Sequence, residues 1–188
     1  MKYFLFVITV VCSLSTLSGQ QVLKQNLTRP EKNYYDFKKT KLLSTGSYYK
    51  DDLGETKYEH GKWEYYSKDG KKEEIRNFYK GKLHGQVLLF WPNGNKKQEG
   101  YFIMDVQDSI YREWSEGDIL LLEGNYKKDR KFGFWKSFYL NGKPKMTEEF
   151  IDSTRYVQAF WSPDSVQTVI NGNGKMVNYY LDNNIKEV

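Results

Sequence analysis

The sequence predicts an all-β protein built as a row of β-hairpins. Three observations lead to this fold class: the composition, a recurring phrase, and the turn residues that end each copy of the phrase. Aromatic residues make up 17 % of the 188-residue chain and tyrosine occurs 16 times, whereas alanine occurs once, at Ala159. Such a chain is poor in helix formers, while aromatic and β-branched side chains favour pleated strands. Repetition of one short unit is typical of a stacked array.

The recurring phrase has an opening glycine, an apolar residue two places later, an aromatic five places later and a turn glycine nine places later. The clearest copies are residues 61–70, 85–94 and 133–142. We assign six starts, with spacings of 24, 23 and 25 residues between the first four, at Gly61, Gly85, Asp108, Gly133, Tyr156 and Gly174. The corresponding turn positions are Gly70, Gly94, Gly117, Gly142, Ser165 and Asn183. Atypical final copies are expected because the ends of an array must cap an open stack.

Each copy is expected to form one hairpin. The aromatic segment is the first strand, and an Asp-Gly or Asn-Gly pair supplies the positive φ angles of a tight turn. A charged second strand follows, as in residues 71–79 and 119–126, and a glycine-bearing connection leads to the next copy. A lone hairpin is marginal in water, so neighbouring hairpins must stack and bury each other's aromatic side chains.

Two rows of side chains are expected to run across the hairpins. One row holds Trp63, Val87, Ile110 and Trp135; the other holds Tyr66, Phe90, Phe138, Trp161 and Tyr179, and is interrupted by Glu113. The two positions differ in parity, which places them on opposite faces of a regular strand. Either both faces are partly covered, or a bulge near the turn rotates one row, and the sequence leaves both alternatives open.

One combination of motifs resembles a known family. The pattern Gly-Lys-Trp-x-x-Tyr-x-x-x-Gly starting at Gly61, followed by a Lys/Glu-rich strand and by Gly81-Lys-Leu-His-Gly85, is similar to the MORN repeat in its bacterial variant form. The resemblance covers about residues 45–185. It implies an elongated, twisted single sheet of stacked hairpins. Bacterial chains of this kind are often described as antitoxin-like, which would make a protein the partner.

The first 19 residues have the layout of a secretory signal peptide: Lys2, an apolar run over residues 3–12, and small polar residues up to a cleavage site after Ser18 or Gly19. We expect export to the periplasm, the outer membrane or the exterior. A lipid anchor at Cys12 is disfavoured because Val11 precedes it. Residues 20–44 are expected to form an N-terminal segment and residues 45–188 the repeat domain. Residues 41–58 contain two possible strands around Asp51–Gly54 and are a candidate worn first repeat.

Charge and side-chain chemistry exclude several function classes. The net charge is +5, and the basic residues are interspersed with acids, as at Lys127-Lys-Asp-Arg-Lys131, so we expect solvated strand edges and no nucleic-acid partner. His60 and His84 each precede a repeat-opening glycine, which indicates a structural role, such as an imidazole bonding a nearby carbonyl, and no metal site. The carboxylates Glu64, Glu113 and Asp118 resemble a glycosidase pair only loosely. We expect no catalytic residues and no cofactor.

Four aromatic residues remain as candidate binding residues. Trp91, Trp114, Tyr139 and Tyr180 each lie six places after an assigned start, immediately before the turn. An exposed aromatic ladder there would suit a glycan or a peptide strand, whereas stacking between hairpins is the alternative role. We therefore expect an exported, non-enzymatic protein-interaction module, with antitoxin-like neutralisation as one form of it. A carbohydrate- or lipid-surface-binding module is the alternative.

Overall fold

The described residues form one long antiparallel sheet and a small two-stranded one, with almost no helix. The computed structural model describes residues 26–54, 57–179 and 185–187, so the expected signal peptide and Cys12 lie outside the described residues. The strands are β1 (Glu31–Tyr34), β2 (Leu42–Lys50), β3 (Lys57–Tyr66), β4 (Lys72–Tyr79), β5 (Lys82–Leu83), β6 (Gly85–Phe90), β7 (Lys96–Ile103), β8 (Val106–Trp114), β9 (Leu120–Lys127), β10 (Arg130–Phe138), β11 (Pro144–Ile151), β12 (Thr154–Trp161), β13 (Gln167–Ile170), β14 (Asn173–Gly174), β15 (Asn178–Tyr179) and β16 (Ile185–Glu187).

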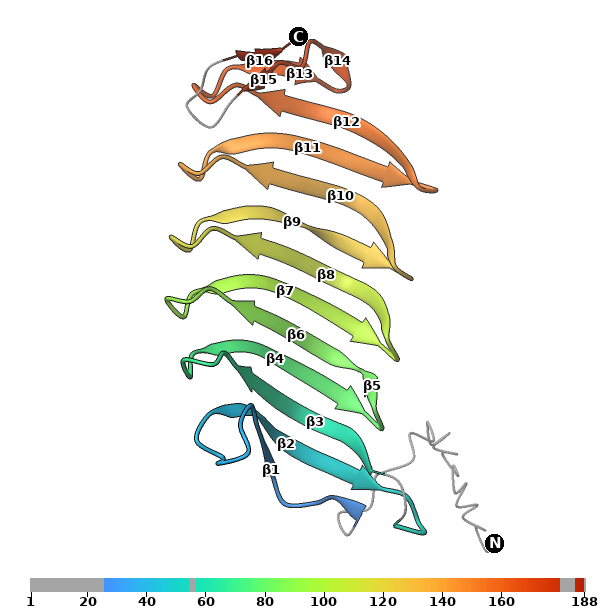
Figure 1. The fold of residues 1–188 in the computed structure, drawn as a ribbon. Coiled ribbons are helices and arrows are strands. Elements are labelled where there is room, and N and C mark those ends of the chain that lie inside the picture. Colours follow the sequence, from blue (N-terminus) through green and yellow to red (C-terminus); the bar gives the residue numbers. More distant parts are fainter. Residues whose placement is uncertain (1–25, 55–56, 180–184, 188) are drawn as a thin grey trace, which may run out of the picture.

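The strands follow one another across the sheet in chain order. Fourteen belong to the main sheet, from β1 to β14, with β5 pairing beside β4; β15 and β16 form a separate two-stranded sheet. Figure 1 shows bowed strands stacked along one axis, with the sheet twisting from one end to the other. This open array of stacked hairpins confirms the predicted fold class.

The two ends of the array differ from the predicted repeat. The two strands expected within residues 41–58 are β2 and the start of β3, which flank the turn at Asp51–Gly54. Strand β1 lies within the expected N-terminal segment and extends the sheet by pairing with β2. The sixth copy adds only β14 to the main sheet, and its turn position, Asn183, lies outside the described residues.

The third copy begins one residue later than the sequence suggested. Gly61, Gly85 and Gly133 all have positive φ, and the residue with positive φ in the third copy is Ser109, at 72°, not Asp108. Its turn residue is likewise Asp118, at 63°, not Gly117. The spacing between the four starts is then 24 residues throughout. The predicted start and turn were one residue off because Ser109 and Asp118 occupy left-handed positions that glycine usually fills.

This shift also corrects both side-chain rows. Tyr111, which is buried and packs against Trp135 with ring centroids 5.7 Å apart, takes the place assigned to Ile110. Trp114 pairs with Leu120 in the way that Tyr66 pairs with Lys72. The second row is therefore not interrupted by Glu113, because Trp114 continues it.

The two margins of the sheet carry different turns. At the margin that follows β3, the Ser67 N–H donates to the Lys71 carbonyl and closes the turn. Only the glycine of the Asp-Gly pair, Gly70, has positive φ, so the turn is a three-residue loop with a bulge. Asp69 and Asn93 instead accept hydrogen bonds, from the Ser67 hydroxyl and the Asn95 N–H. The paired positive φ angles occur at the other margin, in the two-residue turns Lys80-Gly81, Met104-Asp105, Lys128-Asp129 and Asp152-Ser153.

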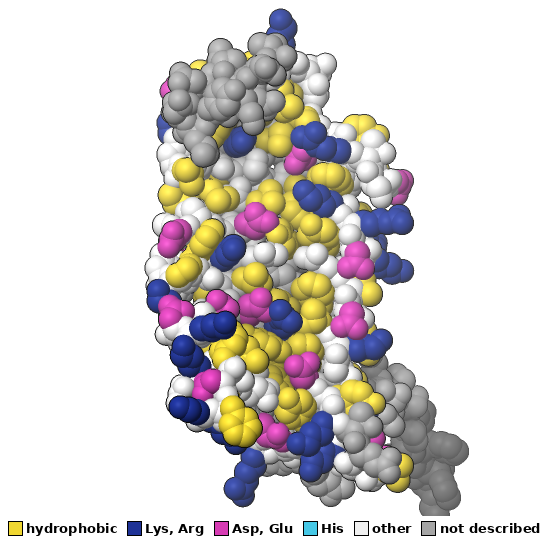
Figure 2. Space-filling model, viewed as in Figure 1, with side chains coloured by type: hydrophobic (Ala, Val, Ile, Leu, Met, Phe, Trp, Pro, Cys, Tyr) yellow, Lys and Arg dark blue, Asp and Glu magenta, His cyan; other side chains and the backbone are white. Residues whose placement is uncertain are grey.

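Two tryptophans form the densest parts of the core. Trp63 and Trp135 have no exposed surface, and each indole lies flat over a glycine of the preceding strand, Gly46 or Gly124. Each Nε1–H donates to the carbonyl that follows that glycine, at 3.1 Å in both cases. Figure 2 shows hydrophobic side chains gathered along the middle of one face, with many Lys and Arg side chains towards the margins.

The rows lie on opposite faces, which decides the question that the sequence left open. Trp63 contacts Tyr65, and the Tyr66 hydroxyl donates to Glu64, at 2.7 Å, on the other face. A bulge also occurs near each turn, but it lies in the second strand, where Glu73 has no partner in the register between β3 and β4. The first-strand rows are therefore not rotated, and both faces are partly covered.

Neighbouring hairpins are tied in pairs at the three-residue turns. The Tyr35 hydroxyl donates to the Tyr66 carbonyl, the Trp91 indole to the Trp114 carbonyl, and the Tyr139 hydroxyl to the Trp161 carbonyl, at 2.9, 3.0 and 2.7 Å. The hairpins between them carry serine at the same position, and each serine hydroxyl accepts from its own turn; these residues are Ser67, Ser115 and Ser162. The structural period at this margin is thus two hairpins.

Candidate functional site

The four predicted aromatic residues do not form one ladder. Trp91 is the first residue of a turn, Trp114 ends strand β8, and Tyr139 lies two hairpins beyond Trp91. Trp91 and Trp114 are adjacent, because the Trp91 indole donates to the Trp114 carbonyl. Trp91 and Tyr139 occupy the same position of their hairpins, but the hairpin between them has Ser115 at that position. Tyr180 lies outside the described residues. The side-chain hydrogen bonds of Trp91 and Tyr139 tie neighbouring hairpins together.

Lysines also cover the two tryptophan rings. The Lys97 ammonium lies 4.7 Å from the Trp91 ring centroid, and the Lys96 ammonium lies 4.3 Å from that of Trp114. Both indoles are half-buried. A sugar that stacked on the covered ring faces would have to displace these cations, which lose a favourable electrostatic contact when they leave.

His60 has a structural contact of a different kind from the one expected. Its Nδ1 accepts a hydrogen bond from the Lys80 N–H, at 3.3 Å, so it bonds a donor and not a carbonyl. Burial, and then the nearby Lys80 charge, lower the pKa of His60 below its ordinary value of 6.5. The Tyr79 ring lies between the two imidazoles, 5.4 Å from His60 and 5.9 Å from His84. Among the residues that the structure describes, no group of three metal-ligating side chains converges.

The three candidate carboxylates do not converge either. Glu64 pairs with Lys62 at 2.8 Å and Lys72 at 3.0 Å, and Lys62 is the main reason that its pKa falls to about 2. Glu113 accepts a hydrogen bond from Tyr111 and lies on the opposite face of the sheet from Glu64, and Asp118 lies in a turn. Burial, followed by Glu113, raises the pKa of both Tyr111 and Tyr126. Each of these side chains therefore interacts within its own hairpin or with a neighbouring hairpin.

The strongest candidate site is a notch at the margin of two-residue turns, between the β9–β10 turn and the β11–β12 turn. We call it the β9–β10 notch, and it encloses about 520 Å³ lined by Lys127, Lys128, Arg130, Lys131, Phe132, Asp152 and Ser153. The sequence folds this way because Lys128 and Asp129 adopt positive φ, at 52° and 63°, which closes a tight hairpin. The Asp129 carboxylate accepts the Gln107 N–H at 2.7 Å and fixes this turn to the preceding one.

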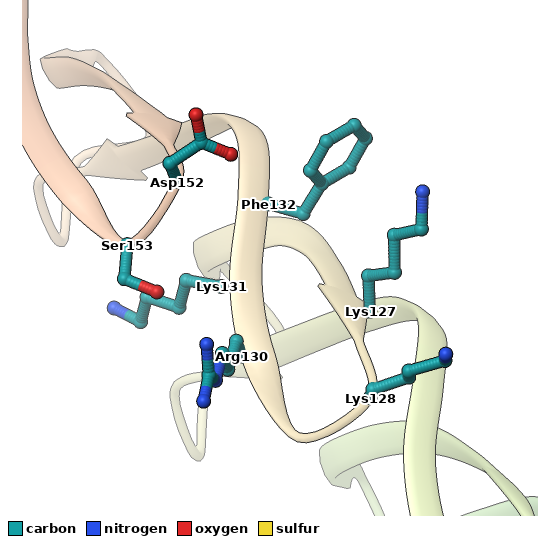
Figure 3. A pocket seen from close by; sticks show the side chains of 7 residues that line it. All are labelled: Lys127, Lys128, Arg130, Lys131, Phe132, Asp152 and Ser153. Carbon is teal, nitrogen blue, oxygen red and sulfur yellow. The ribbon is translucent and has the colours of Figure 1, made fainter.

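The side chains of the notch combine positive charge with one exposed aromatic ring. Figure 3 shows Lys127, Lys128 and Phe132 on one side of strand β10, with Arg130, Lys131 and Ser153 on the other side. The Lys127 ammonium lies 5.0 Å from the Phe132 ring centroid, and Phe132 is 51 % exposed. Lys131 lies 4.2 Å from the ring centroid of Trp135.

The four cations of the notch lack carboxylate partners. Within residues 26–54, 57–179 and 185–187, none of Lys127, Lys128, Arg130 and Lys131 forms an ion pair, whereas Arg155 nearby pairs with Glu148. Asp152 is the single acid that lines the notch. An anionic group is therefore the ligand that this arrangement favours electrostatically.

A comparison of the repeat copies indicates this notch, although the mixed charge of the sequence does not. From the sequence alone, the run Lys127-Lys-Asp-Arg-Lys131 predicts a solvated edge, because acids are interspersed among the basic residues. In the 24-residue register, the turn positions of Lys128 and Asp129 correspond to Lys80-Gly81 and to Met104-Asp105. Only this copy places cations on both sides of the turn, which an alignment of the copies could have revealed.

The described residues thus form an open β-hairpin array, and its β9–β10 notch combines cations with an exposed aromatic ring. The sequence matches no family model. No curated protein matches it. No helix of the described residues is both long and apolar enough to cross a membrane.

Proposed function

We propose that this protein is an exported, non-enzymatic protein-interaction module of the MORN-like repeat type. The observation that carries the proposal is the β9–β10 notch, where four cations that have no carboxylate partner among the described residues lie beside a half-exposed phenyl ring. Binding residues on turns that a regular scaffold holds in place are typical of recognition proteins. Neutralisation of a partner, as in an antitoxin, is one form that such binding takes.

The polar groups elsewhere support a binding role over a catalytic one. Glu64, Glu113 and His60 each have a structural partner that holds the array together, namely Lys62, Tyr111 and the Lys80 N–H. A catalytic pair would need two such groups to converge on one substrate position. The two carboxylates instead occupy opposite faces of the sheet.

Affinity capture tests this function. The purified protein, immobilised through its C-terminal end, is exposed to an extract of the cells that produce it, and bound proteins are identified by mass spectrometry. We expect one protein at a stoichiometric level that binds the purified chain again when isolated. Binding to purified cell-wall glycan, with loss of that binding in Trp91→Ala together with Trp114→Ala and no protein partner, would favour the carbohydrate-binding alternative.

A further inference from the structure

The chemistry of the β9–β10 notch indicates what kind of protein segment binds there. We infer that the notch takes an acidic peptide segment of the partner, with carboxylates against Lys127, Lys128 and Arg130 and an apolar side chain against Phe132. This inference rests on the proposed function and names the site and the chemistry of its ligand. The argument has three parts: charge, the exposed ring, and size.

Charge sets the sign of the ligand. Lys127, Lys128 and Arg130 lie in a stretch of four residues, and the carboxylate of the intervening Asp129 already accepts a hydrogen bond from the Gln107 N–H. Arg130 can bind a carboxylate with two parallel N–H donors, while each lysine acts as a point charge. Their exposed positions mean that the ligand loses little solvation before it meets them.

The exposed ring requires an apolar group in the ligand. Phe132 is 51 % exposed, and Phe134, two residues further along β10, is 55 % exposed. The Lys127 ammonium lies 5.0 Å from the Phe132 ring centroid, so a carboxylate on Lys127 would bring its neighbouring side chain to the part of the phenyl ring that stays exposed. A simple anion such as phosphate would leave this ring in water and gain nothing from it.

Size and the neighbouring acids favour a peptide over an anionic membrane. A volume of about 520 Å³ suits a few side chains, not a flat surface. The adjacent turns along the same margin carry Asp105 and Asp152, and Asp152 also lines the notch. A bilayer laid across this margin would meet both carboxylates, whereas a segment confined to the notch meets four cations and the carboxylate of Asp152.

The test uses two charge variants with the same change in net charge. The notch variant is Lys127→Glu, Lys128→Glu and Arg130→Glu, and the control variant is Lys38→Glu, Lys68→Glu and Lys143→Glu at the opposite margin, where all three lysines are exposed. Each set of three reversals lowers the formal net charge by six, from +5 to −1. Circular dichroism and a melting curve confirm that both variants fold, and Phe132→Ser tests the ring without any change of charge.

The probes are three fluorescent peptide pools of equal length: Glu alternating with Leu and Phe, Gln in place of Glu, and Glu alternating with Ser. We expect the wild-type protein to bind the Glu/Leu/Phe pool most tightly by fluorescence anisotropy. The notch variant should bind it at least about tenfold more weakly, and the control variant should lose less than about twofold. Phe132→Ser should remove the preference for Leu and Phe over Ser.

Several results would overturn the inference. If the notch and control variants lost equal affinity for the peptide, net charge alone would explain the binding. Vesicles of phosphatidylglycerol that bind the wild type and not the notch variant, without peptide binding, would assign the notch to membranes. If the partner isolated by affinity capture binds the notch variant as well as the wild type, the proposed function stands and this site is wrong. If no protein partner exists, the proposed function itself fails.

Discussion

At Gly124 in β9, the indole of Trp135 occupies the space that any side chain would need. A Cβ built on Gly124 would overlap the ring atoms of Trp135, and the same holds for Gly46 and Trp63. Glycine at these positions therefore has a packing reason, not a conformational one, because neither residue has positive φ. The large tryptophan ring therefore fits only because the glycine opposite it has no side chain.

Gly124→Ala is expected to destabilise the protein by about 2 kcal/mol, because the buried indole must move or leave its rotamer. Urea unfolding followed by tryptophan fluorescence measures the change. Gly117→Ala is the matched control: its Cβ meets nothing closer than 3.8 Å and its φ is not positive. The control should be neutral or slightly stabilising, and equal effects in the two variants would contradict this account of the core.

Glu64 is expected to make stability depend on pH in the acid range. Its folded-state pKa, about 2, lies below the ordinary value of 4.5 because Lys62, Tyr66 and Lys72 stabilise the carboxylate. The stabilisation is therefore complete above pH 4.5 and is lost as the pH falls towards 2. Glu64→Gln should cost roughly 1 kcal/mol at neutral pH, since partly exposed ion pairs contribute little, and should cost nothing near pH 2. Urea titrations of both proteins across this range test it; a pH-independent difference would contradict it.

At the scale of the element, each hairpin depends on two left-handed residues, one at its start and one in its turn. In three of the four central hairpins both are glycine, and in the third they are Ser109 and Asp118. A left-handed residue with a side chain is strained by roughly 1 kcal/mol relative to glycine, although Asp tolerates the conformation better than most. The third hairpin thus carries a cost that its neighbours avoid.

Replacement of these two residues by glycine should therefore stabilise the protein. We expect Ser109→Gly and Asp118→Gly to raise the free energy of unfolding by about 0.5–1 kcal/mol each, measured by thermal melting. The control is Asp108→Gly, one residue before the start, where the carboxylate accepts the Lys128 N–H at 3.2 Å. That change should destabilise. Stabilisation by Asp108→Gly instead would mean that the hairpin starts at Asp108.

The same hairpins show how much of the fold the sequence could predict and why the rest was missed. The aromatic segments, the turns and the stacking follow from local periodicity, and β4 lies where residues 71–79 were predicted to form the second strand. The first strand is longer than the predicted aromatic segment from Trp63 to Ser67, because β3 already begins at Lys57, before the opening glycine. The one-residue error at Asp108 arose because glycine alone was used to mark left-handed positions. The notch at Lys127–Phe132 was missed because it joins two turns 24 residues apart, and no local pattern records that a lysine lacks an ion-pair partner.

For the whole molecule, each strand of the main sheet pairs through its backbone only with its neighbours in the sheet order. Stability in such an array is close to a sum of hairpin terms and junction terms. The junctions are not equal, since side-chain hydrogen bonds from Tyr35, Trp91 and Tyr139 tie alternate pairs of hairpins at the three-residue turns. The array is therefore a stack of hairpin pairs, and local opening should follow the boundaries of those pairs.

Hydrogen exchange can test this pairing through Trp91→Phe. The phenyl ring keeps an aromatic side chain at the turn but cannot donate to the Trp114 carbonyl, which should weaken the junction by about 1 kcal/mol. Amides should then exchange faster in both hairpins of the pair, from β6 to β9, and remain unchanged in β3 and β11. Ser67→Ala is the control, because Ser67 accepts only from its own turn, at the Lys71 N–H. Its effect should stay within residues 67–71. If faster exchange in Trp91→Phe were also confined to its own turn, residues 91–95, the hydrogen bond would not couple the two hairpins.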